Sequence, residues 1–510
     1  MQYAILLIMK KNASTNITLT QLNRWFYLFL FTHIIAWTLA PYLLRFTLPL
    51  DAMEGATWGQ HLQWGYDKNP FMNAWLTTLA LKIGGTSGWA VYLFSQISVG
   101  LCFWSVWQLG KKILPPVYAF MAVLLLEGVQ HYNLHAIDFN DNTLELGLWA
   151  LTVYFFYQAL SNKKLLPWLL TAIFAALGMM AKYYTALLLF SMLLFLVVHK
   201  RNWQVFKNRH FYAAAIVFLI IIAPHFIWLF SHNFITVTYA FDRVSSAPSW
   251  TNHFVYPLQF AWQMLEAFIP VLVLLALTML GKRPVLTAKP SKISYYDESF
   301  LLLTGLGPFI LTLLLSVIFG MKLRAGWGMP LLTFWGLLLL VYFQLNITRA
   351  LLYRFIALIF ITLFLLLAGY SYALLRANST SSAIFPGQEI AEKLTNEWHT
   401  RYHTKLAYIA GPRWLGGNIM LYSTDHPSVF MDWDLQRSSW IDIHDLERHG
   451  AIFAWQISEG EMLPLAVKQQ HPQLTPLETL RFHWYRNKNL PAIEIGVVYL
   501  PPKALKLNAN

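Results

Sequence analysis

Long apolar segments recur along most of the chain and constrain its fold more than any other feature of the sequence. A hydropathy window of about 19 residues identifies about eleven of them, each long enough to cross a bilayer as a helix. They lie near residues 25–47, 87–109, 115–134, 142–160, 164–181, 183–199, 211–231, 257–280, 299–319, 327–345 and 350–374. Backbone polar groups must be satisfied internally in lipid, and helices achieve this within one segment. The pattern therefore predicts a mainly α-helical, polytopic membrane protein.

The composition excludes an ordinary soluble protein and a nucleic-acid-binding protein. Of the 510 residues, 57% are hydrophobic and 12% are charged, whereas soluble domains carry about 25% charged residues. The net charge is +13, but the Lys and Arg residues lie in short clusters between apolar segments, as juxtamembrane anchors do. The single cysteine, Cys102, lies inside an apolar segment, so we expect neither disulfides nor a cysteine-based metal site.

The basic clusters predict the orientation of the chain in the membrane. They fall at 10–11, 110–112, 162–164, 199–209 and 281–292, with Arg349 and Arg354 further on. All lie on one side if about eleven segments span the membrane, and the positive-inside rule makes that side the cytoplasm. We therefore expect a multi-pass protein of the bacterial inner membrane with a cytoplasmic N-terminus. Everything after about residue 375 is then periplasmic.

The loops on the opposite side carry most of the acidic residues of the membrane region, together with isolated cations. Ionisable groups at a membrane boundary are costly unless they face water or one another. Their collection on one side predicts a polar cavity that opens outward.

The region after residue 375 has a different composition. Four short runs, "KLAYIAG", "PSVFMDW", "GAIFAWQ" and "EIGVVYL", are typical of strands. Segments 386–402 and 416–425 favour helices, and the stretch at 376–387 favours a linker. We predict a transmembrane domain over 1–375 and a small α/β domain over 376–510.

An ordered set of outer-loop motifs resembles a known superfamily. The set comprises an acidic motif after the first span, "GYDKNPFMNAWL", "AIDFNDNTLELGLW", "GMMAKYYTALLL" and "KLRAGWGMP". It is similar to the bacterial branch of the protein mannosyltransferase and aminoarabinose (lipid A) transferase superfamily, over roughly residues 20–370. These are GT-C glycosyltransferases that take sugars from polyprenyl phosphate carriers. Two features depart from the family pattern: Asp51 and Glu54 are separated by two residues, and Asn69-Pro70-Phe71-Met72 lacks the second proline.

The first outer loop holds the candidate catalytic carboxylates. Transfer from a sugar phosphate to a hydroxyl needs a base near the acceptor oxygen and cations near the leaving phosphate. We choose Asp51 as the base because partial desolvation just past a span raises the proton affinity of a carboxylate. Glu54 is the alternative, and both residues can instead cap the first turn of a helix.

The second outer loop offers Asp138 and Asp141, which share a face if the segment is helical. We favour Asp138 as catalytic, whereas Asp141 also fits an N-cap of the following span. His131 and His135 complete a possible metal-ligating face with Asp138. Because the sequence offers no further ligands beside them, we interpret these residues as the polar end of a helix. We therefore expect no metal and no other cofactor.

Cations in the outer loops are candidate ligands of the phosphate, although snorkelling to lipid headgroups is the alternative. One acid and two aromatic residues, whose rings can stack on a sugar, join these cations in the predicted binding site. The predicted binding residues are Lys182, Arg324, Lys322, Lys68, Arg243, Asp141, Tyr66 and Trp327.

The predicted function is transfer of a sugar from a polyprenyl (undecaprenyl) phosphate carrier to an envelope lipid, glycan or protein. The alternatives are a polymerase or ligase of lipid-linked glycans and a transporter of lipid-linked sugars. A transporter is expected to carry charges at bilayer depth and internal repeats. A polymerase is expected to carry a large external loop between late spans. The sequence identifies neither the sugar, nor the acceptor, nor the oligomeric state.

Overall fold

The computed structural model describes residues 17–162, 164–245, 247, 249–281, 293–343, 347–457, 468 and 478–503. The basic residues at 10–11, Lys163 and those of 282–292 lie outside these ranges. The chain divides into two compact units that alternate along the sequence. Unit 1 comprises Met1–Trp37, Ser95–Ile137 and Asp141–Ala368, and unit 2 comprises Thr38–Phe94, Asp138–Asn140 and Gly369–Asn510. The division at residue 375 stays a prediction; unit 2 groups the first outer loop with the C-terminal region.

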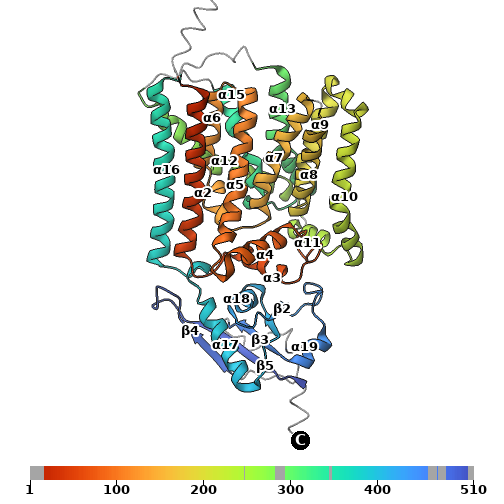
Figure 1. Cartoon of the computed structure of the whole chain (residues 1–510), viewed down its shortest axis with the longest axis vertical. Coiled ribbons are helices and arrows are strands. Elements are labelled where there is room, and N and C mark those ends of the chain that lie inside the picture. Colours follow the sequence, from red (N-terminus) through yellow and green to blue (C-terminus); the bar gives the residue numbers. More distant parts are fainter. Residues whose placement is uncertain are drawn as a thin grey trace, which may run out of the picture. The chain divides into compact units, whose positions relative to one another are not determined.

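Helices make up nearly all of the regular structure before residue 377 (Figure 1). The α-helices are α2 (Leu19–Leu44), α3 (Leu50–Gly59), α4 (Met72–Gly84), α5 (Trp89–Ile113), α6 (Pro116–Leu124), α7 (Asp141–Asn162), α8 (Leu165–Ala181), α9 (Thr185–Val198), α10 (Arg209–Ser231), α11 (Ile235–Val244), α12 (Asn252–Met279), α13 (Tyr295–Gly305), α14 (Gly307–Phe319), α15 (Trp335–Tyr342) and α16 (Arg349–Arg376). Short 3₁₀ segments are η1 (Gly85–Ser87), η2 (Leu125–Gly128), η3 (Gln130–Tyr132), η4 (His135–Ile137), η5 (Lys200–Lys207) and η6 (Ala325–Leu332).

Five helices of the described chain are long and apolar enough to cross a membrane: α2, α5, α10, α12 and α16. The number rises to eight if each of three bent pairs, α9 with η5, α13 with α14 and η6 with α15, forms one span. Every predicted segment contains a helix or a helix pair, which confirms a mainly helical, multi-pass membrane protein. The count of eleven spans stays a prediction.

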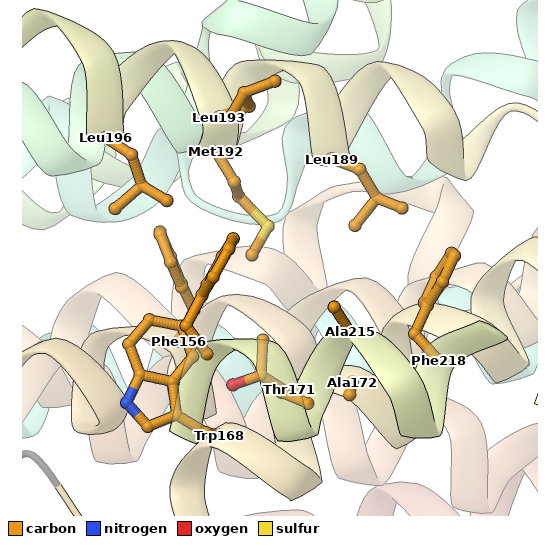
Figure 2. A pocket seen from close by; sticks show the side chains of 12 residues that line it. Phe156, Trp168, Thr171, Ala172, Leu189, Met192, Leu193, Leu196, Ala215 and Phe218 are labelled. Atoms are coloured by element: carbon orange, nitrogen blue, oxygen red, sulfur yellow. The ribbon is translucent and has the colours of Figure 1, made fainter. Parts of the chain in front are cut away.

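The core of unit 1 is apolar and continuous, because several of these helices have no polar face. Its largest buried side chains include Phe26, Trp107, Phe120 and Trp149. Helices α7 to α10 also line an apolar cavity of about 230 Å³. Figure 2 shows Leu189, Met192 and Leu196 on one side of this cavity and Trp168 on the other. The cavity therefore suits hydrocarbon and offers little to a sugar.

The C-terminal part of unit 2 is built on a five-stranded mixed sheet of order β2-β1-β3-β5-β4. The strands are β1 (Tyr408–Gly411), β2 (Ser428–Met431), β3 (Ala451–Gln456), β4 (Glu478–Phe482) and β5 (Ile493–Leu500), and the helices are α17 (Gly387–Tyr402), α18 (Arg413–Tyr422) and α19 (Ile443–His449), with η7 (Ser382–Ile384) before them. β1 is parallel to β2 and β3, whereas β5 is antiparallel to β3 and β4. Helix α18 packs on the sheet and on α17 (Figure 1). The predicted small α/β region is thereby confirmed as a fold; its periplasmic location stays a prediction.

Candidate active site

The predicted site residues fall in both units. Unit 2 contains Asp51, Glu54, Tyr66, Lys68 and Asp138, and unit 1 contains Asp141, Lys182, Arg243, Lys322, Arg324 and Trp327. Within each unit some of them form a cluster.

The first outer loop begins with a buried helix, α3, whose sequence is "LDAMEGATWG". Pro49 precedes it in an extended conformation, and Asp51 lies in the first turn, where an acidic side chain is favoured by the helix dipole. Small residues let neighbouring helices come close: a Cβ on Gly417 of α18 would lie 2.6 Å from Thr57 Oγ1. Residues 52–59 are all buried. The loop is therefore a packed scaffold that holds Asp51 at a helix N-terminus.

Asp138 from the second outer loop caps this helix. The backbone N–H of Asp51 donates to Asp138 Oδ2 at 3.2 Å, and that of Ala52 donates to Asp138 Oδ1 at 2.9 Å. Pro49 has no side chain able to accept these bonds, so a carboxylate distant in sequence supplies the cap. The two predicted catalytic acids, Asp51 and Asp138, are thereby brought together.

The environment of this pair favours proton exchange near neutral pH. Burial raises the pKa of Asp138 to about 7, with a further rise from the charge of Asp51, although the two backbone N–H bonds oppose the shift. Asn140 Nδ2 donates to Asp51 Oδ2 at 2.9 Å and orients that carboxylate. Two adjacent carboxyl groups that cannot both ionise easily are a recurrent arrangement for acid–base chemistry.

Glu54 lies one turn further along α3 and has a different environment. Lys68 Nζ donates to Glu54 Oε1 at 2.5 Å, and Arg413 Nη1 donates to the same oxygen. Burial raises the pKa of Glu54, and the charges of Arg413 and Lys68 oppose that rise. Glu54 Oε1 already accepts from two cationic donors, whereas Asp51 Oδ2 accepts from the neutral amide of Asn140, so the contacts favour Asp51 over Glu54 as the base.

Arg413 is the residue of this cluster that the sequence analysis missed. It is the first residue of α18 and is largely buried, and its Nη2 donates to Asp67 Oδ2 at 2.9 Å and to Asp432 Oδ2 at 3.3 Å. Arg437 Nη1 also pairs with Asp432, at 2.9 Å. The excess of carboxylates over cations in the first outer loop was a signal that a cation from elsewhere pairs with it. The sequence does not say which cation.

Lys182 organises the cluster of unit 1. Its Nζ lies 3.0 Å from Asp141 Oδ2, donates to Asn142 Oδ1, and lies 5.4 Å from the ring centroid of Trp327. Three predicted residues, Asp141, Lys182 and Trp327, are thus brought together. The ammonium is oriented by its partners and half-buried, as a preorganised phosphate ligand should be.

A buried polar chain lies one helical turn from Asp141 and was not predicted. Glu145 is fully buried, and Thr185 Oγ1 donates to its Oε1 at 3.0 Å. Trp149 Nε1 donates in turn to Thr185 Oγ1 at 2.8 Å. This chain joins α7 to α9 and fixes the helix that carries Asp141. The sequence indicates this chain only through the spacing of Asp141 and Glu145, which are four residues apart and so lie on one face of the helix.

The remaining predicted residues lie apart from these contacts. Arg243, Lys322 and Arg324 are exposed, and none of them forms an ion pair with a carboxylate of the described chain. Tyr66 is buried against Trp58, and its hydroxyl donates to the backbone oxygen of His61 at 3.0 Å. Burial raises the pKa of Tyr66 to about 12. The phenol therefore supports the loop, and a role in binding sugar stays a prediction.

The histidines of the possible metal face contact each other. His131 Nδ1 and His135 Nδ1 lie 2.9 Å apart. Within the described ranges, no group of three or more His, Cys, Asp or Glu side chains is arranged to hold a metal ion. A reaction without a protein-bound metal stays a prediction.

Comparisons with known proteins bear on both sequence and fold. Residues 68–228 match the family model described as dolichyl-phosphate-mannose-protein mannosyltransferase. The lipopolysaccharide core galacturonosyltransferase RgtA of Rhizobium johnstonii is 24% identical over 195 residues, which cover 37% of this chain and 39% of that relative. The match thus spans well under two thirds of the relative's length.

Solved structures show the fold. The crystal structure of ArnT from Cupriavidus metallidurans bound to undecaprenyl phosphate has a TM-score of 0.63 at 14% identity, over 93% of this chain and 98% of that one. The apo state of the same protein has a TM-score of 0.59 at 13% identity, over 94% and 98% of the two chains. The fold is therefore shared over nearly the whole chain. Together with the match over residues 68–228, this confirms the resemblance to a superfamily of membrane glycosyltransferases with the GT-C fold.

Proposed function

We propose that the protein transfers a sugar from a polyprenyl phosphate carrier, undecaprenyl phosphate in bacteria, to a hydroxyl or phosphate of an envelope lipid, glycan or protein on the periplasmic side. The observation that carries this proposal is the Asp51–Asp138 pair at the start of α3. It combines a base oriented by Asn140 with an acid titrating near pH 7, within a fold shared with a glycosyltransferase.

Asp51 is the proposed general base. For a hydroxyl acceptor, the acceptor oxygen attacks the anomeric carbon while the bond from that carbon to the carrier phosphate breaks. The acceptor proton passes to the Asp51 carboxylate, and the electron pair leaves with the phosphate. Asp138 acts by holding the N-terminus of α3 and by disfavouring protonation of Asp51 through its own uptake of the shared proton.

Lys182 is the proposed first ligand of the donor phosphate. Negative charge accumulates on that phosphate as the bond breaks, so a fixed cation stabilises the transition state. Asp141, Asn142 and Trp327 already hold the ammonium in place. Exposed Arg243, Lys322 and Arg324 are proposed as further cations that capture the donor, and Lys68 acts through Glu54.

The polyprenyl donor is supported by two considerations. ArnT, which shares the fold, was crystallised with undecaprenyl phosphate. The predicted sidedness points the same way, because nucleotide sugars carry charged diphosphates that do not cross the hydrocarbon layer unaided. We propose no protein-bound metal or organic cofactor, and no nucleic-acid partner.

The test combines a survey of cells with a transfer assay. Mass spectrometry of envelope lipids, glycans and proteins from cells with and without the gene should reveal one sugar modification that disappears, which identifies sugar and acceptor together. The purified protein should then transfer that sugar from its undecaprenyl phosphate carrier, and do so equally after exhaustive chelation. Transfer from a nucleotide sugar instead of the lipid carrier would overturn the proposal.

A further inference from the structure

A second cavity lies in unit 2, where two candidate membrane helices end or begin. Its volume is about 380 Å³, which is within the usual range of small-molecule sites. It is lined by Tyr42, Arg45, Thr47, Ser87, Gln388 and Tyr422, among others. The set has one cation, several hydroxyls and no acidic side chain. Such a lining suits an anion that also carries hydroxyl or ester oxygens.

Arg45 is the cation that defines this cavity. Its Nε donates to Thr47 O at 3.2 Å and its Nη2 donates to Ser382 Oγ at 2.9 Å, so neutral oxygens hold the guanidinium in place. In the part of the chain that the structure describes, no carboxylate forms an ion pair with Arg45, in contrast to Arg413. A half-buried guanidinium fixed by neutral partners keeps its charge available for an anion.

The position of the cavity indicates an anion that belongs to a lipid. Arg45 directly follows α2, and Ser87 lies two residues before α5; both helices are candidate spans. Leu43, two residues before Arg45, and Phe46, directly after it, are 68% and 43% exposed. An exposed apolar surface beside a cation and a hydroxyl-lined cavity matches an amphipathic ligand, with its chain in the membrane and its headgroup in the cavity.

The cavity is also close to the Asp51–Asp138 pair within the same unit. Burial is the main influence on the pKa of Asp138 and raises it, yet Arg45 is near enough for its charge to oppose that rise. Thr47 and Leu48 line the cavity, and only Pro49 separates them from α3. A headgroup in the cavity therefore lies beside the start of the helix that carries Asp51.

We infer that this cavity binds the phosphate of a lipid headgroup, with Arg45 as its principal ligand. The inference rests on the proposed function in one respect, which is that the ligand is a membrane lipid. Binding can be measured without sugar transfer, so the two can be tested separately. Two sources share the chemistry: a prenyl phosphate such as the donor carrier, and a phosphate on another lipid.

The test is binding of three probes to the full-length protein, counted by native mass spectrometry: undecaprenyl phosphate, dodecyl phosphate and inorganic phosphate. Arg45→Gln should weaken binding of the lipid phosphates by about tenfold or more, the loss expected for a charge-assisted hydrogen bond. Arg376→Gln is the matched control, since Arg376 is an exposed arginine at the end of another helix, α16. It should bind as the wild type does.

Two further variants make the outcome decisive. Thr86→Phe fills the cavity from an exposed position and leaves Arg45 intact, so it should also weaken binding even if Arg45→Gln folds poorly. In a Lys182→Met background, where the proposed donor-phosphate ligand is absent, Arg45→Gln should still weaken binding of the lipid phosphates, which separates the cavity from the donor-phosphate site. Equal loss with both lipid phosphates identifies a general phosphate site, and loss confined to undecaprenyl phosphate identifies the carrier. Binding that is equal in the wild type, Arg45→Gln and Thr86→Phe, or that inorganic phosphate reproduces at equal affinity, would overturn the inference of a lipid-headgroup site.

Discussion

Two carboxylates one turn apart in α3 have opposite surroundings. The carboxylate of Asp51 accepts from the amide of Asn140, and the backbone N–H of Asp51 donates to the carboxyl group of Asp138. Glu54 is held by an arginine and a lysine. Glu54 Oε1 is occupied by two cationic donors and Asp51 Oδ2 by one neutral amide, so the contacts favour acid–base chemistry at the first carboxylate and a structural role at the second. The residue types alone leave this choice open.

Asp51→Asn tests the assignment most directly. The amide still accepts a hydrogen bond and should leave the fold intact, but it cannot take the acceptor proton. We expect sugar transfer to fall by roughly 2–4 orders of magnitude, measured as initial rates with the purified protein. Asp242→Asn, which changes an exposed acid of α11, should keep the wild-type rate. Near-normal turnover of Asp51→Asn would move the base to Glu54.

Arg413→Gln probes the ionic cluster. The change leaves Glu54 and Asp67 buried without their guanidinium. Breaking a buried ion pair on one side is strongly destabilising, by roughly 3 kcal/mol or more, and should appear as a lower midpoint of thermal unfolding in detergent. Arg448→Gln removes an arginine whose side chain is 70% exposed and should change stability little.

A double variant separates the charge effect from simple loss of packing. Arg413→Gln combined with Glu54→Gln removes one of the stranded carboxylates, so it should unfold at a higher temperature than Arg413→Gln alone. If the double variant is less stable than the single one, the cluster is not held together by these charges.

Asp138 makes stability depend on pH. Its pKa rises from an ordinary 3.8 to about 7 in the fold, first through burial and then through the charge of Asp51. Between these values the folded protein holds a proton that the unfolded chain has lost, so stability should fall as pH rises toward 7 and then level off. In Asp138→Asn, which cannot titrate, the unfolding midpoint between pH 5 and pH 8 should change less than in the wild type. An unchanged slope would contradict the raised pKa.

Part of this cluster was accessible from the sequence. Charges are scarce in the membrane region, so Asp51, Glu54 and Asp138 stand out on composition alone. Arg413 does not, because it lies 359 residues from Glu54 in a region rich in charged residues. Long-range pairing of this kind is decided by how α18 packs, which no local pattern encodes.

At the scale of elements, α3 depends on close packing against α18. A Cβ on Gly417 would lie 2.6 Å from Thr57 Oγ1 and 2.9 Å from Met53 Cγ, both in α3. Gly417→Ala should therefore push the helices apart, lower the unfolding temperature, and reduce transfer because Asp51 belongs to α3. The control is Gly369→Ala in α16, where a Cβ meets no atom within 4 Å; it should be neutral or slightly stabilising. Equal effects of the two changes would show that the contact is unimportant.

Strands were easier to predict than the helices of the outer loops. The runs that became β1, β2, β3 and β5 are apolar and buried, as period and composition indicate. β4 was missed because "ETLRF" pairs on one side only, with β5, at the edge of the sheet, where polar residues are tolerated. Helices α3, α4 and α11 were read as loop because a window tuned to membrane spans passes over helices of 10 to 13 residues.

At the scale of the whole molecule, a hydropathy window measures the length of an apolar segment and does not detect a bend between two helices within it. The pair α13 and α14 is bent by 44° and the pair η6 and α15 by 52°, yet each reads as one span in the sequence. Gly305 and Gly307 border the first break. The membrane character follows from composition, whereas the number of crossings depends on backbone geometry that a window average removes.

The last prediction concerns sidedness, on which the lipid-linked donor depends. With eleven spans, the first outer loop and the C-terminal region are periplasmic and the basic loops are cytoplasmic. Cys102 is fully buried and should not react with an impermeant thiol reagent, so introduced cysteines report alone. In intact spheroplasts Leu62→Cys, at a position 56% exposed, should be labelled, whereas Lys200→Cys in η5 should be labelled only after lysis. A phosphatase fused after Asn510 should be active.

An inactive fusion beside a labelled Leu62→Cys would mean that a late span is miscounted, which removes Arg324 from the outer side and leaves Asp51 there. Labelling of Lys200→Cys instead of Leu62→Cys would place Asp51 in the cytoplasm, where nucleotide sugars are available, and the polyprenyl phosphate donor would lose its physical reason.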